Sequence, residues 1–215
     1  ADVYPGAVRP LVAEPRHAPE IHGESGFEGP TLPSLARSAS QHHAVEYLIE
    51  TARADEGIWL VATGPLTNVA LALRGAPDLV DRLAGISFMG GSATVGNHSA
   101  VAEFNMLVDP EAAAVVIDSG ARLLMAGLDL THQFVVDDAL ALHLRQIGNP
   151  GALMLADLMV AYLDQVEQVR GAGRRCGLHD PCAVLAVTHD DVVDHTVRRV
   201  AVELTGTHTR GMTVV

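Results

Sequence analysis

Three short, largely apolar runs constrain the fold of this chain more than any other feature. They span residues 58–62, 86–89 and 123–126, and Ser87 is the one polar residue within them; each ends at a turn, and stretches with helical signals lie between and after them. Apolar runs of this length are typical of strands that are buried on both faces of a parallel sheet. The alternation predicts an α/β fold with an open, mostly parallel Rossmann-like sheet and helices on both faces.

The intervening segments carry helix and hairpin signals. Asp109-Pro110 predicts a helix start, because aspartate caps helices well and proline suits their first position. We expect helices at residues 34–54, 66–73, 110–119, 137–147, 153–169 and 182–187, and a C-terminal β-hairpin formed by residues 197–204 and 212–215. Residues 14–33 predict a long polar loop, in which His22-Gly23-Glu24-Ser25-Gly26 is the most site-like part.

Composition bounds the possible functions. The chain has 215 residues, of which 48% are hydrophobic, and this suits one domain spanning residues 1–215. A net charge of −12 argues against nucleic acid as a partner and permits a cation site. Neither a bilayer-spanning run nor a secretory signal is expected. The two cysteines, Cys176 and Cys182, show no zinc spacing and fit a reducing, cytoplasmic compartment.

Polar residues crowd the stretch 96–109, GNHSAVAEFNMLVD. It holds Asn97, His98, Ser99, Glu103 and Asn105, with Phe104 between the last two. An ordinary surface loop explains such residues too, because their side chains satisfy local backbone groups. In parallel sheets, however, ligands bind beyond the carboxyl ends of the strands. Three further polar segments are expected at that same edge, namely Thr63, Thr131-His132 and His179-Asp180.

The residue types at this edge suggest a sugar and a hard cation. The sequence has no nucleophile elbow, no phosphate-binding glycine loop and no zinc pattern. Carboxylates, amides and backbone carbonyls suit Ca²⁺ or Mg²⁺, and beside such an ion they suit a sugar diol. His179 next to Asp180 suits a general acid or an orienting group beside a metal ligand. The alternative is that Asp180 only caps the helix starting at Pro181.

Several longer motifs give the chain a family resemblance. They are HGESGFEGP at residues 22–30, LVATGPLTN at 60–68, FMGG at 88–91, GNHSAVAEFN at 96–105, DPEAA at 109–113, GLDLTH at 127–132 and LHDP at 178–181. Because these motifs occur in the order found in the family, the chain resembles the inosine–uridine-preferring nucleoside hydrolases over nearly its whole length. The resemblance implies a Ca²⁺-dependent enzyme that hydrolyses the N-glycosidic bond of ribonucleosides to ribose and free base. It also implies a small-molecule ribonucleoside substrate, no membrane partner, a place in purine or pyrimidine salvage, and a homodimer or homotetramer.

The resemblance also implies a role for each matching residue. The carbonyl of Thr63 and the carboxylate of Asp180 are expected to bind calcium. Sugar-side residues are expected at Asn97, Glu103 and Asn105, which would hold the ribose hydroxyls, and at Met89 and Phe104, which would line the pocket. His179 is expected near the base as a leaving-group acid, and His22 as a second base-side residue.

One departure from the family is important. The family carries an Asp-x-Asp-x-Gly-x-Asp-Asp motif after an apolar strand, and no such motif occurs in these residues. We therefore expect an internal fragment, incomplete at both ends and inactive as given. Two other hypotheses are a non-catalytic nucleoside- or sugar-binding module and an unrelated α/β scaffold. The sequences of the motifs HGESG, SAVAEFN and GLDLTH are most similar to those of the pyrimidine-preferring branch of the family.

Overall fold

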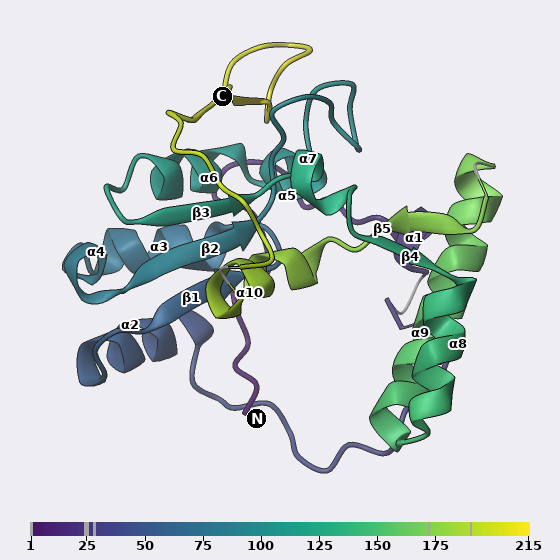
Figure 1. The fold of residues 1–215 in the computed structure, drawn as a ribbon. Helices are drawn as coiled ribbons and strands as arrows, with labels where there is room; N and C mark the ends of the chain where they lie inside the picture. The colour runs from purple at the N-terminus through teal and green to yellow at the C-terminus, as the bar shows by residue number, and fades with distance from the viewer. Residues whose placement is uncertain (1, 24–25, 28, 172, 190) are drawn as a thin grey trace. The chain divides into compact units, whose positions relative to one another are not determined.

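The computed structural model describes residues 2–23, 26–27, 29–171, 173–189 and 191–215. They form two compact units (Figure 1). Unit 1 comprises Ala1–Pro15, Arg37–Thr131 and His179–Val215, and unit 2 comprises Arg16–Ala36 and His132–Leu178. That all 215 residues form one domain stays a prediction.

A parallel three-stranded sheet forms the centre of unit 1. Its strands are β1 (Trp59–Ala62), β2 (Gly85–Met89) and β3 (Leu123–Ala126), in the order β1-β2-β3. Leu60 pairs with Ile86 in one ladder, and Phe88 pairs with Met125 in the other. Every residue of β2 is buried, including Ser87, as the central position of this strand in a parallel sheet predicts. The three strands predicted from the sequence are therefore confirmed.

Helices cover both faces of this sheet. Figure 1 shows the helices α2 (Ala44–Ala54), α3 (Thr67–Gly75) and α6 (Pro110–Ile117) behind the strands and α10 (Asp180–Thr188) in front of them. The short helix α4 (Leu79–Arg82) precedes β2. On the front face, the Ser87 hydroxyl donates to the carbonyl of Ala183 at 2.7 Å, which fixes α10 against β2. The predicted fold class is confirmed.

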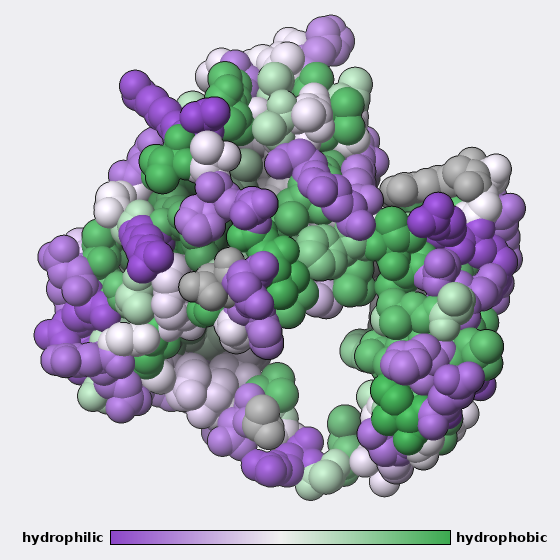
Figure 2. Space-filling model, in the orientation of Figure 1, coloured by the Kyte–Doolittle hydropathy of each residue, from purple (hydrophilic) through white to green (hydrophobic). Residues whose placement is uncertain are grey.

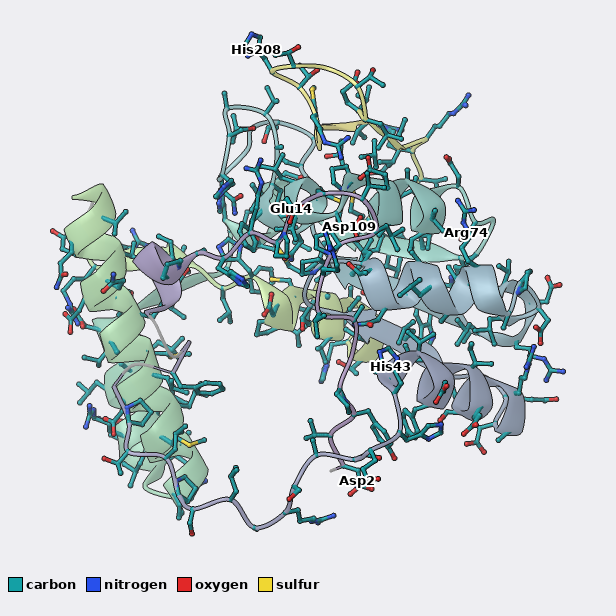
Figure 3. All side chains as sticks on the ribbon, turned by 180° about the vertical axis from the view of Figure 1, so that it is seen from behind. Asp2, Glu14, His43, Arg74, Asp109 and His208 are labelled. Carbon is teal, nitrogen blue, oxygen red and sulfur yellow. The ribbon has the colours of Figure 1, made fainter. Side chains whose placement is uncertain are left out.

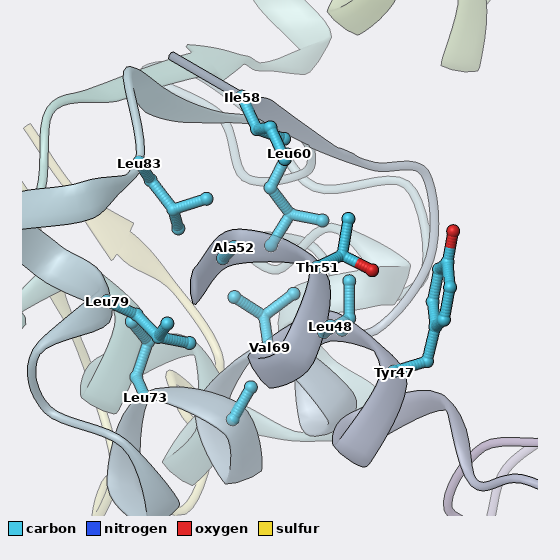
Figure 4. A pocket seen from close by; sticks show the side chains of 11 residues that line it. Tyr47, Leu48, Thr51, Ala52, Ile58, Leu60, Val69, Leu73, Leu79 and Leu83 are labelled. Atoms are coloured by element: carbon cyan, nitrogen blue, oxygen red, sulfur yellow. The ribbon is translucent and has the colours of Figure 1, made fainter. Parts of the chain in front are cut away.

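The core of unit 1 lies between the sheet and the helices behind it. Leu66, Ile86, Phe88 and Met106 are fully buried there. A cavity of about 170 Å³ lies beside this core, and Figure 4 shows that its lining is almost wholly aliphatic. It is lined by Tyr47, Leu48, Thr51, Ala52, Ile58, Leu60, Val69, Ala72, Leu73, Leu79 and Leu83. None of the predicted site residues is among them, so the chemistry belongs elsewhere.

The helix predicted at residues 34–54 begins only at Ala44, so its first half was wrong. The preceding segment bonds to the start of the chain instead, because Ser40 N donates to Val3 O and Ala44 N to Pro5 O. Helix α2 then begins at an N-cap, His43, whose Nδ1 accepts from Val45 N at 3.2 Å. Long-range backbone pairing therefore overrode the helical spacing in residues 34–43.

Unit 2 is a helical hairpin with a small β-ribbon. Its helices are α1 (Pro19–His22), α8 (Asp138–Ile147) and α9 (Pro150–Arg170); its strands are β4 (Val135–Asp137) and β5 (Arg175–Gly177), which pair antiparallel. Helix α8 confirms the prediction, whereas α9 begins three residues early, at a cap formed by Asn149. The ribbon was not predicted, because strands of three residues carry no readable periodicity. Green and purple side chains alternate over α8 and α9 in Figure 2.

The C-terminal hairpin is present but short. Only β6 (Ala201–Val202) and β7 (Thr213–Val214) pair, in antiparallel fashion. The strands predicted at 197–204 and 212–215 extend further than the ladder, because the Glu203 carboxylate accepts from Thr205 N and Gly206 N and turns the chain. Among the described residues, no helix is long and apolar enough to cross a membrane.

Candidate functional site

The turn that follows β2 starts the site. Gly91 has φ +73°, and a side-chain Cβ there would lie 2.8 Å from the Thr213 methyl carbon. Only glycine fits such a position without strain. The Gly91 N–H donates to Glu103 Oε2 at 3.1 Å, and its carbonyl accepts from Leu128 N at 2.9 Å. The turn thus connects β2 to two other segments of unit 1.

Glu103 is the most enclosed acidic residue among those predicted for the site. It is 2% exposed and is the N-cap of the short helix α5 (Phe104–Val108). Its Oε1 accepts from Asn105 N at 2.9 Å, and its Oε2 accepts from Met106 N and Gly91 N, each at 3.1 Å. Burial raises the pKa of this carboxyl, the three N–H groups oppose that shift, and the negative charge of Asp180 adds to it.

Asn105 brings the end of β2 against α5. Its Nδ2 donates to the Met89 carbonyl at 3.1 Å and lies 3.4 Å from the Met89 sulfur. Both residues are buried. The structure therefore unites Met89, Glu103 and Asn105, which the sequence separates by up to sixteen positions.

A more exposed loop carries Asn97. The Asn97 Oδ1 accepts from Phe104 N at 2.9 Å, so this loop is bound to the start of α5. The ring of His98 meets Phe104 edge-on, with 5.3 Å between the ring centroids. The sequence predicted Asn97 and Phe104 in the site, but it gave no signal for the contact of His98 with Phe104.

His179 lies at the start of α10 and bonds to a buried hydroxyl. Its Nδ1 is 2.8 Å from Oγ1 of Thr131, the last residue of α7 (Leu128–Thr131). Thr131 is fully buried. The alternative that Asp180 caps α10 is wrong, because the N-cap is His179 and Asp180 is the first residue within the helix. A carboxylate in the first turn is still favoured by the helix dipole.

The remaining predicted site residues are less closely defined. Thr63 is exposed and directly follows β1. His22 is the last residue of α1, in unit 2, and its role in the site stays a prediction. Glu24, Ser25 and Glu28 of the same motif fall outside the described residues.

The donor set at this edge fits a hard cation in its chemistry. Asp180 and the Thr63 carbonyl, which the sequence predicted as ligands, offer oxygen only, and oxygen is what Ca²⁺ and Mg²⁺ take. The two carboxyls of Asp180 and Glu103 repel each other, and a cation would relieve this repulsion. The described part of the chain contains no group of three or more His, Cys, Asp or Glu side chains arranged to hold a metal.

A second carboxylate of unit 1, that of Asp109, is fully buried. Asp109, which is labelled in Figure 3, accepts from Leu11 N at 2.9 Å, from the Thr67 hydroxyl at 2.6 Å and from Ala112 N at 3.1 Å. The Asn68 side chain accepts from Ala7 N at 2.8 Å. These bonds fix the segment 7–11 against α3 and α6. The sequence predicted only the helix cap at Asp109, because the other partners are distant in the chain.

Comparisons with known proteins show the family of the chain. The family model described as inosine-uridine preferring nucleoside hydrolase matches residues 1–215. A pyrimidine-specific ribonucleoside hydrolase RihA from Salmonella arizonae is 42% identical over 98% of this chain and 68% of its own. A RihA from Escherichia coli O9:H4 is 41% identical over the same shares.

Solved structures are similar as well. A purine-preferring ribonucleoside hydrolase from Gardnerella vaginalis superposes with a TM-score of 0.94 at 31% identity, covering 100% of this chain and 69% of that one. An inosine-guanosine nucleoside hydrolase gives a TM-score of 0.86 at 30% identity, over 99% and 69%. The predicted fold class and the predicted enzyme class, a ribonucleoside hydrolase, are confirmed, whereas the expected inactivity of residues 1–215 by themselves stays a prediction. The chain belongs to the inosine–uridine preferring nucleoside hydrolase family.

Proposed function

We propose that the protein prefers pyrimidine ribonucleosides and cleaves their N-glycosidic bond with the help of a bound Ca²⁺. The observation that carries this proposal is the buried cluster of Met89, Glu103 and Asn105 beside Asp180, at the carboxyl end of β2. For the base preference, the support is the 42% identity to a relative named as pyrimidine-specific, against 31% to one named as purine-preferring.

The sugar-side residues suit a polyhydroxylated ligand that gains positive charge. Cleavage of an N-riboside develops positive charge at the anomeric carbon, and a nearby carboxylate stabilises it. Glu103 supplies that charge, and three backbone donors hold it in place. The amides of Asn97 and Asn105 hold ribose hydroxyls, while Met89 and Phe104 line the apolar side of the sugar.

Asp180 and the Thr63 carbonyl are the calcium ligands in this proposal. When bound, the cation holds the sugar diol and lowers the pKa of a coordinated water. Asp180 is exposed at the start of α10, where its oxygens can reach a ligand without disturbing the core.

His179 acts on the leaving base. Its Nε2 is the ring nitrogen that is not bonded to Thr131, and it gives a proton to the departing pyrimidine. Such general acid catalysis contributes about 10²–10⁴-fold to a rate. His22 contacts the base as a second residue.

The test is release of free base from uridine, cytidine and inosine by the protein expressed from its complete coding sequence. We expect uridine and cytidine to react faster than inosine, and a calcium chelator to abolish release from all three.

Asp180→Asn should raise the calcium concentration needed for half-maximal activity, whereas Asp55→Asn, at an exposed position after α2, should not. Faster inosine cleavage would refute the base preference. Release from none of the three, with calcium present, would favour a nucleoside- or sugar-binding module.

We also infer that the protein is a cytoplasmic homo-oligomer, a dimer or a tetramer, which serves pyrimidine salvage. Cys176 and Cys182 are both buried and neither is disulfide-bonded, which fits a reducing compartment. Sedimentation velocity tests the oligomeric state, and fractionation of cells tests the location.

A further inference from the structure

The hydrogen bond between Thr131 and His179 joins the two residues that flank a long segment belonging to unit 2. The chain leaves unit 1 after Thr131 and returns to it at His179, 48 residues later. The bond therefore joins the last residue before the excursion to the first residue after it. Thr131 is fully buried, so water does not compete for its hydroxyl.

The helix that carries Thr131 is itself fixed to the sugar site. Thr131 N donates to Gly127 O at 3.0 Å, and Leu128 N donates to the Gly91 carbonyl at 2.9 Å. The N–H of the same Gly91 donates to Glu103. Hydrogen bonds thus connect Gly91 directly to Glu103 on the sugar side, and through α7 and Thr131 to His179 on the base side.

A threonine hydroxyl suits this place chemically. It can donate to a bare Nδ1 and accept from a protonated one, so it stays bonded to the imidazole in either state. A bond at Nδ1 sets the rotation of the ring and hence the direction of Nε2. Valine has nearly the same shape but can do neither.

We propose that Thr131 is a positioning residue, whose buried hydroxyl holds the His179 ring so that Nε2 faces the leaving base. The proposal rests on the proposed function of His179 as the acid for that base. Thr131 contacts neither sugar nor base in this role, and its effect depends entirely on whether the leaving group needs a proton.

Two substrates separate this role from a general structural one. Uracil needs protonation as it leaves uridine, whereas 4-nitrophenolate leaves 4-nitrophenyl β-D-ribofuranoside readily as an anion. We expect Thr131→Val to lower kcat for uridine about ten- to hundredfold, a part of what general acid catalysis supplies, with KM within about twofold. The nitrophenyl riboside should keep kcat within about twofold, and Thr131→Ser should restore most of the uridine rate.

Thr67→Val is the matched control. It also removes a buried threonine hydroxyl of unit 1, but the lost bond is to Asp109. Any loss it causes should be equal on both substrates. If Thr131→Val likewise slows both substrates equally, or slows neither, the positioning role is wrong.

His179→Ala distinguishes this proposal from the one on which it depends. If His179→Ala slows uridine far more than the nitrophenyl riboside while Thr131→Val does not, only the role of Thr131 fails. If His179→Ala slows both substrates equally, the acid role of His179 fails, and the role of Thr131 fails with it.

Discussion

At the scale of single residues, the site depends on one buried carboxylate and one glycine. Glu103 is the N-cap of α5, where three backbone N–H groups hold its two oxygens, and the proposed function gives the same oxygens to the sugar. Gly91 supplies one of those donors and tolerates the close approach of Thr213. Binding chemistry and local folding are therefore not separable at Glu103.

Glu103→Gln tests how much the capping role of Glu103 stabilises unit 1. An amide has one oxygen, so its NH₂ group must face a backbone N–H wherever it is turned, and a donor is left unsatisfied. We expect the free energy of unfolding to fall by about 1–3 kcal/mol. Urea unfolding followed by the fluorescence of Trp59, the single tryptophan, which lies in β1, reports on unit 1. Glu56→Gln, at an exposed position, should change it by less than about 0.5 kcal/mol, and equal effects of the two would contradict the role.

At the scale of elements, two clusters of hydrogen bonds hold segments that are distant in the chain. In unit 1, Asp109 connects α3, α6 and the segment 7–11. In unit 2, Arg174 pairs with Asp138 of α8 and Asp164 of α9, so it joins the two helices of the hairpin. The first cluster is buried and the second lies at the surface, so they should respond differently to mutation and to pH.

Asp109→Ala should destabilise unit 1 strongly. The change leaves three donors without their acceptor, and two of the three bonds, those from Thr67 and Ala112, are buried. We expect a loss of about 2–5 kcal/mol in the free energy of unfolding, again measured with urea and Trp59 fluorescence. Thr67→Val removes one of the three bonds and should cost clearly less. A loss no larger than that of Thr67→Val would show that Asp109 only caps α6.

Asp138 should make the stability of unit 2 depend on pH. The hydrogen bond from Arg174 lowers the pKa of the Asp138 carboxyl below its ordinary value of 3.8. A lowered carboxyl pKa contributes stability that is present above the ordinary value and is lost as the pH falls through the folded-state value. Asp138→Asn should therefore melt below the wild type near neutral pH, and the gap should close at pH values below 3.8.

Thermal melts followed by circular dichroism across this range measure the gap. Arg174→Gln should show the same closing gap, and added salt should narrow it at neutral pH because both partners are exposed. A gap that stays constant down to strongly acid pH would exclude the ion pair as its cause.

At the scale of the whole molecule, local signals predicted the sheet and most helices, whereas long-range bonds set the rest. The strands β1, β2 and β3 were readable as short, largely apolar runs that each end at a turn, and α6 was readable from its cap at Asp109. Residues 34–43 were mispredicted because their partners, Val3 and Pro5, are far away in sequence.

The same distinction holds for the site. Convergence at one sheet edge predicted that the stretch with Glu103 and Asn105 lies near Thr131 and His179, since parallel strands end on the same side, whereas Met89 was predicted only from the family resemblance. The bonds that orient these side chains, from Gly91 to Glu103 and from Thr131 to His179, join segments that no spacing rule connects.

Binding of ribose should change hydrogen exchange in unit 1 only, because every residue proposed for the sugar side belongs to unit 1. In the protein expressed from its complete coding sequence, with calcium present, ribose at about 100 times its Kd should stabilise the site by about 2.7 kcal/mol. Hydrogen exchange should slow in residues 89–106, which include the three N–H groups that donate to Glu103, and stay unchanged in residues 138–170.

2-Deoxyribose lacks one hydroxyl of the diol and should protect much less, and a chelator should remove the effect. Equal protection by both sugars would mean that the diol is not what the site recognises, and protection of α8 and α9 would mean that the sugar site is not confined to unit 1.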